Sequence, residues 1–392
     1  MRAGPSQEEI RRHNLGALLR HVHLRGATSR AELTTILGLN RSTIGALTAD
    51  LVTAGLVVEG APRETGRAGR PSLVVRPNSR VYAFALSVEV DRVRAARVGL
   101  GGAVLDRREA ARPRGLTAGE TAPLLAGFVK EMHDAVPTAA VYVGGGVAVS
   151  GMVRREDGMV RLSPHKGWLD EPLGEVLRAE LGRDRPVAVG NAADLSALAE
   201  HTRGVAVDCE NVIFLTGDVG IGAGIIAGNR LISGHGGYGG EVGHMVVNPG
   251  GQPCGCGSRG CWETEIGEHA LLRAAAREGL TGQDAVFAVV DPAARGDAGA
   301  QSAVRKVGDW LGFGVANLVN IFNPEMVIFG GTLRDVYLAS AAQVRSRLNA
   351  MALPACREHL RLRTPKLGED AALIGAAELA FQQVLADPLD AA

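Results

Sequence analysis

One histidine and three cysteines lie close together in the segment GHMVVNPGGQPCGCGSRGCWE. They are His244, Cys254, Cys256 and Cys261. Nitrogen and sulfur ligands in this number fill a tetrahedral Zn²⁺ shell, and the glycines between the cysteines allow a short chain to fold around an ion. We therefore predict a structural zinc loop over residues 244–261, in which the metal orders the loop and performs no chemistry itself.

The two remaining cysteines, Cys209 and Cys356, lie far apart, which argues against a disulfide framework in a chain of 392 residues. Reduced cysteines are consistent with a cytosolic protein. Two other interpretations of the cluster remain: reduced thiols in a glycine-rich turn without metal, and a catalytic zinc with an open fourth position. The spacing C-x-C-x4-C behind an upstream histidine favours the structural site.

The composition is that of an ordinary globular chain, since 46% of the residues are hydrophobic and 21% are charged. The length allows two or three domains with substantial cores. The N-terminal segment is charged rather than apolar, and no uninterrupted apolar stretch approaches the roughly 18 residues that a membrane span needs. The sequence therefore predicts a cytoplasmic protein with no membrane partner.

Positive charge is concentrated at the N-terminal end of a chain whose net charge is zero. Residues 1–80 contain 12 Arg and 6 Asp or Glu, a net charge of +6, so the remaining residues sum to −6. A basic region of this kind suits a polyanionic partner, and arginine can bind bases and phosphates in a bidentate manner. This region is therefore the candidate nucleic-acid-binding module.

Helical spacing and capping signals divide the basic region into three helices. The inward residues of the first helix, over residues 10–23, are predicted to be Ile10, Leu15, Leu18, Leu19 and Val22. A capping box of Ser29 and Glu32 opens a second helix that ends at Gly38. Asn40 caps a third, whose inward residues are predicted to be Ile44, Leu47, Leu51 and Val52. With a following strand at 56–59, this order predicts a winged helix-turn-helix over residues 1–75.

In a winged helix-turn-helix, the N-terminal end of the recognition helix contacts base edges and phosphates. The side chains that we expect to bind DNA in this module are Arg30, Asn40, Arg41, Ser42, Thr43 and Thr48. Between the wing strands, glycines and a proline alternate with arginines, and Arg67 and Arg70 are predicted to enter a narrow minor groove. Double-stranded operator DNA is the expected partner. A three-helix module for protein contacts and a flexible, solvated wing tip are the alternatives.

After a linker at 76–80, strands alternate with helices from residue 81 onwards. Strands are predicted at residues 84–90, 92–100, 141–149, 187–191, 212–215, 225–226 and 326–329, and helices at 118–136, 173–181, 194–201 and 304–321. Alternation of this kind is typical of an α/β body. The sequence therefore predicts an α/β domain over residues 81–392.

A glycine-rich turn at 217–224, GDVGIGAG, precedes a second glycine-rich run, GGYGGEVGH, which leads into the zinc loop. By itself, the first turn fits a tight hairpin as well as a phosphate-binding loop. Together with SPHKGWLDEPL, GNAADLSALAE, CGCGSRGCWE and NIFNPEMVIFGG, these segments resemble the ROK family of repressors and sugar kinases. The resemblance implies a two-lobed actin-like (ribonuclease H-like) ATPase fold, and the N-terminal winged helix is typical of the family's repressor branch.

The resemblance also implies a sugar site. ROK kinases hold their sugar with the Glu and the His of a G-E-x-G-H motif, with the Glu after the zinc cysteines, and with the Asn of an Asn-Asp pair. The corresponding residues here are Glu241, His244, Glu263 and Asn191, and Gly151 and His165 lie where the family places additional contacts. Carboxylates and amides at such positions suit a polyol, because each can make two hydrogen bonds to vicinal hydroxyls.

Two positions depart from the kinase pattern. The Asp of the Asn-Asp pair, the catalytic base of ROK kinases, is Ala192 here, so nothing at that position can accept the proton of the sugar hydroxyl. Asp194 would point about 200° away on a helix and is expected to be a poor substitute. The first phosphate motif of the family, D-x-G-x-T, is replaced by SVEVDR, whose acidic groups would repel a triphosphate.

These observations predict a non-enzymatic transcriptional regulator, most simply a repressor, with structural Zn²⁺ as its metal. The expected effector is a sugar, an amino sugar or a sugar phosphate, and two-fold operator symmetry favours a homodimer or homotetramer. One alternative is a DNA-binding protein that is also an active ATP-dependent sugar kinase. Another is a ROK repressor controlled by a protein partner.

Overall fold

The computed structural model describes residues 6–62, 72–137, 139–182, 186–217, 220–277, 279 and 282–390. Contacts between residues divide the chain into two compact units. The first comprises residues 1–148, 172–190 and 376–392, and the second comprises 149–171 and 191–375. The winged helix falls within the first unit, so the predicted limits of a separate module at 1–75 and of a domain at 81–392 stay predictions.

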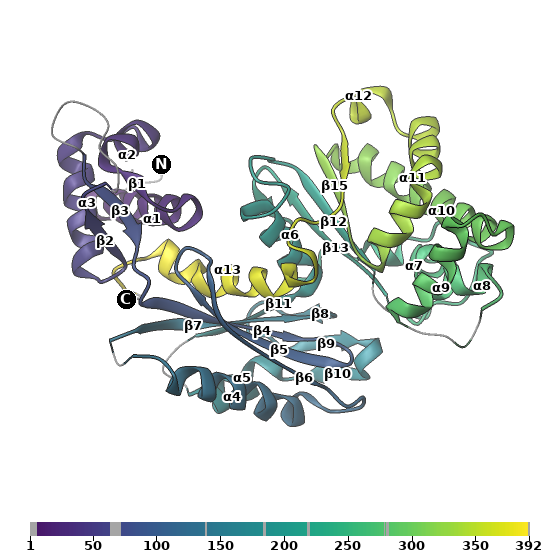
Figure 1. Ribbon diagram of the computed structural model, residues 1–392, viewed down its shortest axis with the longest axis horizontal. Coiled ribbons are helices and arrows are strands. Elements are labelled where there is room, and N and C mark those ends of the chain that lie inside the picture. The colour runs from purple at the N-terminus through teal and green to yellow at the C-terminus, as the bar shows by residue number, and fades with distance from the viewer. Residues whose placement is uncertain are drawn as a thin grey trace. The chain divides into compact units, whose positions relative to one another are not determined.

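The N-terminal part of the first unit has the predicted order of elements (Figure 1). Helices α1 (Gln7–Arg25), α2 (Arg30–Leu37) and α3 (Arg41–Thr53) precede strands β2 (Val57–Gly60) and β3 (Val74–Pro77), and β1 (Thr28–Ser29) completes a sheet in the order β1-β3-β2. The predicted capping box of Ser29 and Glu32 is present. The side chain of Asn40 accepts a hydrogen bond from the backbone N–H of Thr43, so the third helix also starts as predicted.

Two of the residues predicted to face inward from α1 and α3 do not face the core. Ile10 is 48% exposed and Val52 is 41% exposed, whereas the other predicted inward residues of α1 and α3 are buried. Successive helical residues are separated by about 100° around the axis. Val52 therefore turns away from the face that Leu51 shares with Ile44, and Ile10 lies to one side of the stripe that begins at Leu15.

The body of the first unit is a five-stranded sheet in the order β11-β7-β4-β5-β6. Its strands are β4 (Val81–Val88), β5 (Arg92–Gly99), β6 (Val104–Ala111), β7 (Val141–Val149) and β11 (Val187–Asn191). Helices α4 (Ala118–Asp134) and α5 (Leu173–Leu181) lie on one face of this sheet, and α13 (Ala371–Ala386) lies on the other (Figure 1). A Cβ atom on Gly146 of β7 would lie 1.9 Å from the carbonyl oxygen of Ala376, so this strand and α13 approach each other closely.

The second unit contains another five-stranded sheet, in the order β14-β13-β12-β15-β16, and a small sheet in the order β10-β9-β8. The strands are β8 (Met152–Val153), β9 (Val160–Ser163), β10 (Trp168–Glu171), β12 (Val212–Gly217), β13 (Ile221–Ala227), β14 (Arg230–Leu231), β15 (Met326–Gly331) and β16 (Arg361–Arg363). The helices are α6 (Ala192–Thr202), α7 (Glu263–Ile266), α8 (Glu268–Ala274), α9 (Gln283–Ala294), α10 (Ala298–Phe322), α11 (Thr332–Met351) and α12 (Pro354–Arg357), with 3₁₀ turns η1 (Pro164–Lys166), η2 (Val242–His244) and η3 (Gly368–Asp370).

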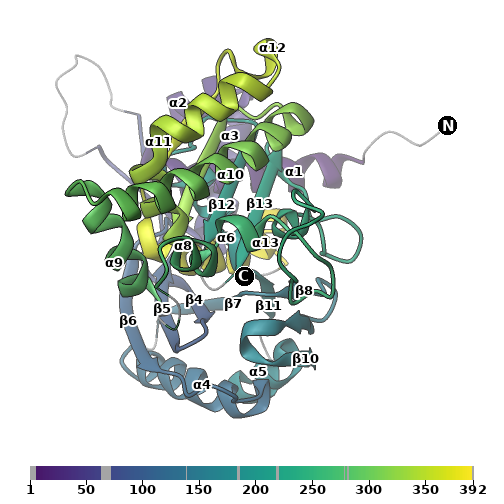
Figure 2. The same ribbon diagram turned by 90° about the vertical axis from the view of Figure 1, so that its right-hand side faces the viewer.

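Alternation along β12 builds the core of this unit on both faces of the larger sheet. Ile213 and Leu215 pack into the large cluster that includes the inward faces of α10 and α11, while Val212 and Phe214 pack with Ala197 of α6. Figure 2 shows α10 and α11 running along the same side of β12 and β13. Since side chains alternate between the faces of a strand, this sheet is buried on both sides and α6 is held against it. None of the helices in the described part of the chain is long and apolar enough to cross a membrane.

Candidate metal centre and ligand site

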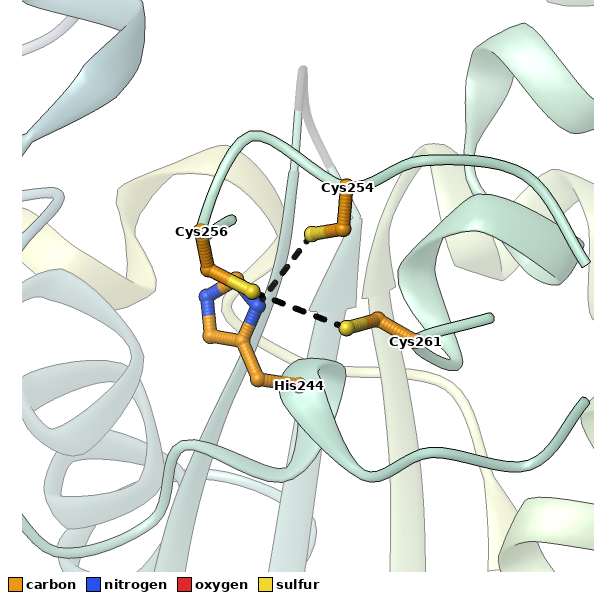
Figure 3. Close-up of side chains that lie close together, drawn as sticks. All are labelled: His244, Cys254, Cys256 and Cys261. Atoms are coloured by element: carbon orange, nitrogen blue, oxygen red, sulfur yellow. Dashed lines mark hydrogen bonds between the residues drawn. The ribbon is translucent and has the colours of Figure 1, made fainter. Parts of the chain in front are cut away.

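The four predicted metal ligands converge in the second unit (Figure 3). Their ligand atoms all lie within 4.8 Å of one another. His244 belongs to η2, and the three cysteines belong to the loop that leads into α7. The Sγ atom of Cys254 lies 3.6 Å from Nδ1 of His244, and the Sγ atoms of Cys256 and Cys261 lie 3.7 Å apart.

These distances fit a tetrahedral zinc site. Zn–S bonds of about 2.3 Å and Zn–N bonds of about 2.0 Å at tetrahedral angles place sulfur atoms about 3.8 Å apart and a sulfur and a nitrogen about 3.5 Å apart. Burial raises the pKa of the Cys254 thiol, whereas a bound dication favours the thiolate. Because Nδ1 of His244 faces the thiols, these residues would hold Zn²⁺ through three sulfurs and Nδ1, and the ion would supply structural order.

Two local features close this loop. Val246 forms an isolated antiparallel bridge with Cys261, and Pro253 forms another with Arg259. Gly260 has a φ of 69°, and a Cβ atom there would lie 1.5 Å from the carbonyl oxygen of Asn248. A side chain at this position would therefore force the two arms of the loop apart, which explains the glycine directly before the last cysteine.

Asn191 and Gly151, two of the predicted sugar-binding residues, are in direct contact. The amide of Asn191 donates to the carbonyl oxygen of Gly151 over 2.8 Å, and its carbonyl oxygen accepts from the backbone of Ala193 and Asp194 as the cap of α6. Gly151 has a φ of 138°, and a Cβ atom there would lie 2.6 Å from the carbonyl oxygen of Leu162. The turn at Gly151 therefore requires glycine, and Asn191 fixes it to the start of α6.

The other predicted sugar-binding residues gather near the loop that carries the candidate metal ligands. A Cβ atom on Gly220 would lie 2.8 Å from Nε2 of His165 and 3.2 Å from Oε2 of Glu263, so both side chains reach the backbone at Gly220. Oε1 of Glu263 lies 3.7 Å from Nδ1 of His244. Burial raises the pKa of Glu241, while the nearby His244 lowers it and Glu263 raises it further. The structure thus brings together Glu241, His244, Glu263 and His165.

Asp194 is a buried carboxylate that the sequence prediction placed away from the site. Asp194 is 7% exposed, and its Oδ1 atom has no hydrogen-bond partner among the residues that the structure describes. Burial, together with the charge of Glu241, raises its pKa to about 7, while Arg155 opposes this shift. The helix-direction argument separated Asp194 from Ala192 but did not foresee that a burial of this kind would bring it under the influence of Glu241.

Lys166 is a second buried charge that the sequence reasoning missed. It is 4% exposed, and its Nζ atom donates to Oγ of Ser150 over 2.5 Å and to the Ser150 carbonyl oxygen over 3.2 Å. Ser163 donates to the same carbonyl oxygen over 2.7 Å. These bonds hold the turn at Gly151 to the loop that carries His165. No spacing signal in the sequence distinguishes this lysine from a solvated loop residue.

The segment SVEVDR lies in the first unit, at the turn from β4 to β5. The carboxylate of Glu89 is paired with Arg92 and lies 3.1 Å from Nε of Arg94. Ser87 donates to the same carboxylate over 3.2 Å. This turn is therefore occupied by an acidic side chain with its own cationic partners.

The predicted DNA-binding residues have different surroundings. Arg41 and Ser42, at the start of α3, are exposed, and the Ser42 hydroxyl donates to the Asn40 cap. Arg30 makes a bidentate ion pair with Glu59 of β2. Thr48 is fully buried and donates to the carbonyl oxygen of Ile44, because residues four apart share one helix face. This corrects the expectation that Thr48 faces DNA. Arg67 and Arg70 lie outside the described residues.

An N-terminal winged helix, two five-stranded sheets and a Cys3His loop define the class: an actin-like α/β fold with a winged helix before it. The ROK family model matches residues 84–383. The chain therefore belongs to the ROK family.

The chain is similar to family members of both branches. It is 27% identical to a xylose repressor from Bacillus spizizenii, over 97% of each chain. A crystal structure of a ROK family transcriptional regulator, a homologue of the E. coli MLC protein, superposes with a TM-score of 0.81 at 26% identity, over 97% of this chain and 98% of that one. The ROK glucokinase from Streptomyces griseus, solved with glucose and AMPPNP, gives a TM-score of 0.65 at 29% identity, over 77% of this chain and 99% of that one.

Proposed function

We propose that this protein is a DNA-binding transcriptional repressor that responds to a sugar and does not phosphorylate it. One observation carries this proposal: the chain combines a winged helix with the residues that correspond to the family's sugar contacts. Ala192 stands at the position that corresponds to the catalytic aspartate of the kinases. The similarity to a xylose repressor over 97% of both chains supports the same assignment.

The effector would bind among Asn191, Glu241, His244, Glu263 and His165, with Gly151 providing backbone contacts. Glu241 and Glu263 can each accept two hydrogen bonds from neighbouring hydroxyls, and Nε2 of His244 is available to donate when Nδ1 is the metal ligand. The structural zinc loop would fix the positions of Glu263 and His244 relative to each other. Sugar binding at Asn191 would act directly on α6, because the same side chain caps that helix.

A neutral sugar or an amino sugar fits this site better than a sugar phosphate. Asp194, Glu241 and Glu263 bring three carboxyl groups to the site. Burial raises the pKa of both Asp194 and Glu241, and the charge of a neighbouring carboxylate, Glu241 and Glu263 respectively, raises each further. A phosphate dianion added to this environment would be repelled. A sugar hydroxyl or ammonium group would instead supply the hydrogen-bond donor that Oδ1 of Asp194 lacks within the described residues.

The rival function is sugar kinase activity, and Asp194 is the observation that favours it. A carboxylate with a pKa of about 7 has the proton affinity of a general base at neutral pH. The absence of a carboxylate at Ala192 and the acidic side chain of Glu89 in the former phosphate turn argue against it. A coupled ATPase assay with D-glucose and D-xylose separates the two, because kinases ordinarily turn over at about 1–100 s⁻¹.

The proposed DNA interface consists of Arg41, Ser42 and Thr43 at the start of α3, with Arg67 and Arg70 in the wing. Asn40 would act mainly through its cap, and Arg30 mainly through its pairing with Glu59. Zn²⁺ would be the resident metal, and a cytoplasmic homodimer or homotetramer would match a two-fold symmetric operator. Sugar binding would shift the population between conformations of the sugar-binding body that place the DNA-reading modules differently.

The deciding experiment begins with an operator obtained by selecting random DNA duplexes with the ligand-free protein. D-xylose, D-glucose, N-acetylglucosamine and glucosamine 6-phosphate are then titrated into the complex, and each is also titrated into free protein by calorimetry. We expect one unphosphorylated sugar to lower operator affinity at least about fivefold, the lower end of typical allosteric coupling. Selection of no duplex, or binding of no sugar, would refute the proposal. Operator release only on addition of a protein from the host would favour the partner-controlled alternative.

A further inference from the structure

Helix α1 of the winged helix is joined to α13 within the first unit by a buried polar contact. His23, near the end of α1, is fully buried, and Glu378 of α13 is 5% exposed. Nε2 of His23 lies 3.0 Å from Oε2 of Glu378. On the other side of the ring, the backbone N–H of Gly101, in the turn after β5, donates to Nδ1 of His23 over 3.1 Å.

The Gly101 contact determines which ring nitrogen of His23 carries the proton. Because Nδ1 accepts a hydrogen bond from a backbone N–H, its lone pair is committed, and the proton of the neutral ring resides on Nε2. That proton is then donated to the carboxylate of Glu378. One side chain of the winged helix therefore hydrogen-bonds to two partners, in the turn after β5 and on α13, that belong to the body of the first unit.

The rest of the α1–α13 contact is close-packed. The ring centroids of His23 and Phe381 lie 5.1 Å apart. A Cβ atom on Gly16 would lie 2.7 Å from the carbonyl oxygen of Leu385, so the two backbones approach more closely than any other residue would allow. Residue numbers rise along α1 as they fall along α13, so the helices are antiparallel, and Arg12 pairs with Asp387 at 3.2 Å beyond Gly16.

The first turn of α13 lies in the second unit and packs against α6 there. Gly375 is the last residue of the second unit. A Cβ atom on Gly375 would lie 1.9 Å from the carbonyl oxygen of Leu195 in α6, which leaves no room for a side chain. The cap of α6 is Asn191, a residue of the proposed sugar site. One helix is thus tightly fitted to the sugar-site helix at its start and to α1 of the winged helix further along.

We propose that α13 is the connector through which sugar binding controls the winged helix, and that His23 is the positioning residue that fixes α1 to it. The inference rests on the proposed function, since it assigns a route to the regulation proposed above. Contacts with no free space transmit a displacement rather than absorb it, because packed interfaces have discrete arrangements. Loosening the α1–α13 contact should therefore leave sugar binding and operator binding intact but remove the effect of sugar on operator affinity.

Two substitutions loosen this contact in different ways. Gly16→Ala introduces a methyl group against the Leu385 carbonyl, and its matched control is Gly127→Ala in α4, where a Cβ atom would meet nothing within 4 Å. His23→Leu removes both hydrogen bonds of the ring, whereas the amide of His23→Gln can still donate to Glu378. For each protein, operator affinity is measured with and without the active sugar, and sugar affinity is measured by calorimetry.

We expect Gly16→Ala and His23→Leu to bind sugar and ligand-free operator within about threefold of the wild type, while their operator affinity changes less than twofold on sugar addition. Gly127→Ala should respond as the wild type does, and His23→Gln should recover part of the response. A wild-type response in both loosened variants would overturn the connector. A wild type that responds to no sugar would instead overturn the proposed function, and the connector with it.

A measurement on the unaltered protein covers the case in which the variants do not fold. Saturating sugar should change the amide hydrogen exchange of residues 376–386 in α13 and of Gly101, because both sides of the contact must move together. Exchange that changes around Asn191 but not at α13 or Gly101 would mean that sugar binding stops at the second unit, and the proposed connector would be wrong.

Discussion

The side-chain amide of Asn191 donates a hydrogen bond to the carbonyl oxygen of Gly151 over 2.8 Å. The same side chain caps α6, so one residue joins the turn at Gly151 to the start of a helix. Asn191 therefore has two roles, a contact in the proposed sugar site and a cap that stabilises α6. Substitutions that keep one role and remove the other can test them separately.

Asn191→Ser retains a helix cap but cannot span the distance to Gly151. We expect the free energy of unfolding of this variant to lie within about 0.5 kcal/mol of that of the wild type, since serine is as good a cap as asparagine. Its sugar affinity should nevertheless be about tenfold lower. Asn191→Ala should lose about 1 kcal/mol more, because the N–H groups of Ala193 and Asp194 lose their acceptor. Urea unfolding and calorimetry measure both effects. Unchanged sugar affinity in both variants would remove Asn191 from the proposed site.

Local signals predicted the features that depend on neighbouring residues. The caps at Ser29 and Asn40 and the bounds of β7, β11 and α5 are as predicted, because capping and periodicity act over a few residues. The convergence of the four candidate metal ligands was also predictable, because all of them belong to one short segment.

Features that depend on distant segments were not predictable. His23 and Glu378 are 355 residues apart in sequence, and nothing in the spacing of α1 indicates a partner near the C-terminus. The burial of Asp194 beside Glu241 depends on β13, where Gly224 allows α6 to approach; a Cβ atom there would lie 2.9 Å from the Asp194 Cα. Thr48 differs, since its four-residue spacing from Ile44 already indicated an inward position.

Cys256→Ser tests the metal centre. The wild-type protein should contain about one zinc per chain, and the variant should lose most of it, because oxygen replaces one of the three sulfur ligands of the proposed shell. Sugar affinity should fall as well, since the loop leads directly into Glu263. Cys356→Ser, outside the cluster, is the matched control and should retain metal and affinity. Elemental analysis after chelator dialysis gives the stoichiometry, and a variant with full metal content would exclude the assigned ligand set.

Asp194 makes stability depend on pH. In the folded protein, burial raises the pKa of the Asp194 carboxyl from 3.8 to about 7. The corresponding stabilisation is therefore present below pH 4 and is lost as the pH rises through 7. A shift of this size corresponds to at most about 4 kcal/mol of unfolding free energy.

Asp194→Asn removes this titration, so the variant should unfold with a free energy near that of the wild type at pH 4 and higher than that of the wild type at pH 8. Glu180→Gln, on the exposed side of α5, is the control for a lost surface carboxylate and should leave the pH profile unchanged. Urea unfolding at several pH values gives the comparison. Parallel profiles for Asp194→Asn and the wild type would mean that the Asp194 carboxyl is ionised without penalty in the folded protein.

Arg41→Ala tests the proposed DNA interface independently of the sugar site. Arg41 is exposed at the start of α3, where a guanidinium can bind a base edge or a phosphate in a bidentate manner. Losing such a contact costs about 1–3 kcal/mol, so operator affinity should fall roughly five- to 150-fold. Sugar affinity should stay within twofold, because the proposed sugar contacts all lie in the second unit.

Arg295→Ala, an exposed arginine of that unit, controls for the loss of one positive charge. Fluorescence anisotropy with the selected operator measures the first effect and calorimetry the second. Equal losses of DNA binding in both arginine variants would show that net charge, rather than a contact made by α3, determines the affinity, and the recognition helix would have to be sought elsewhere.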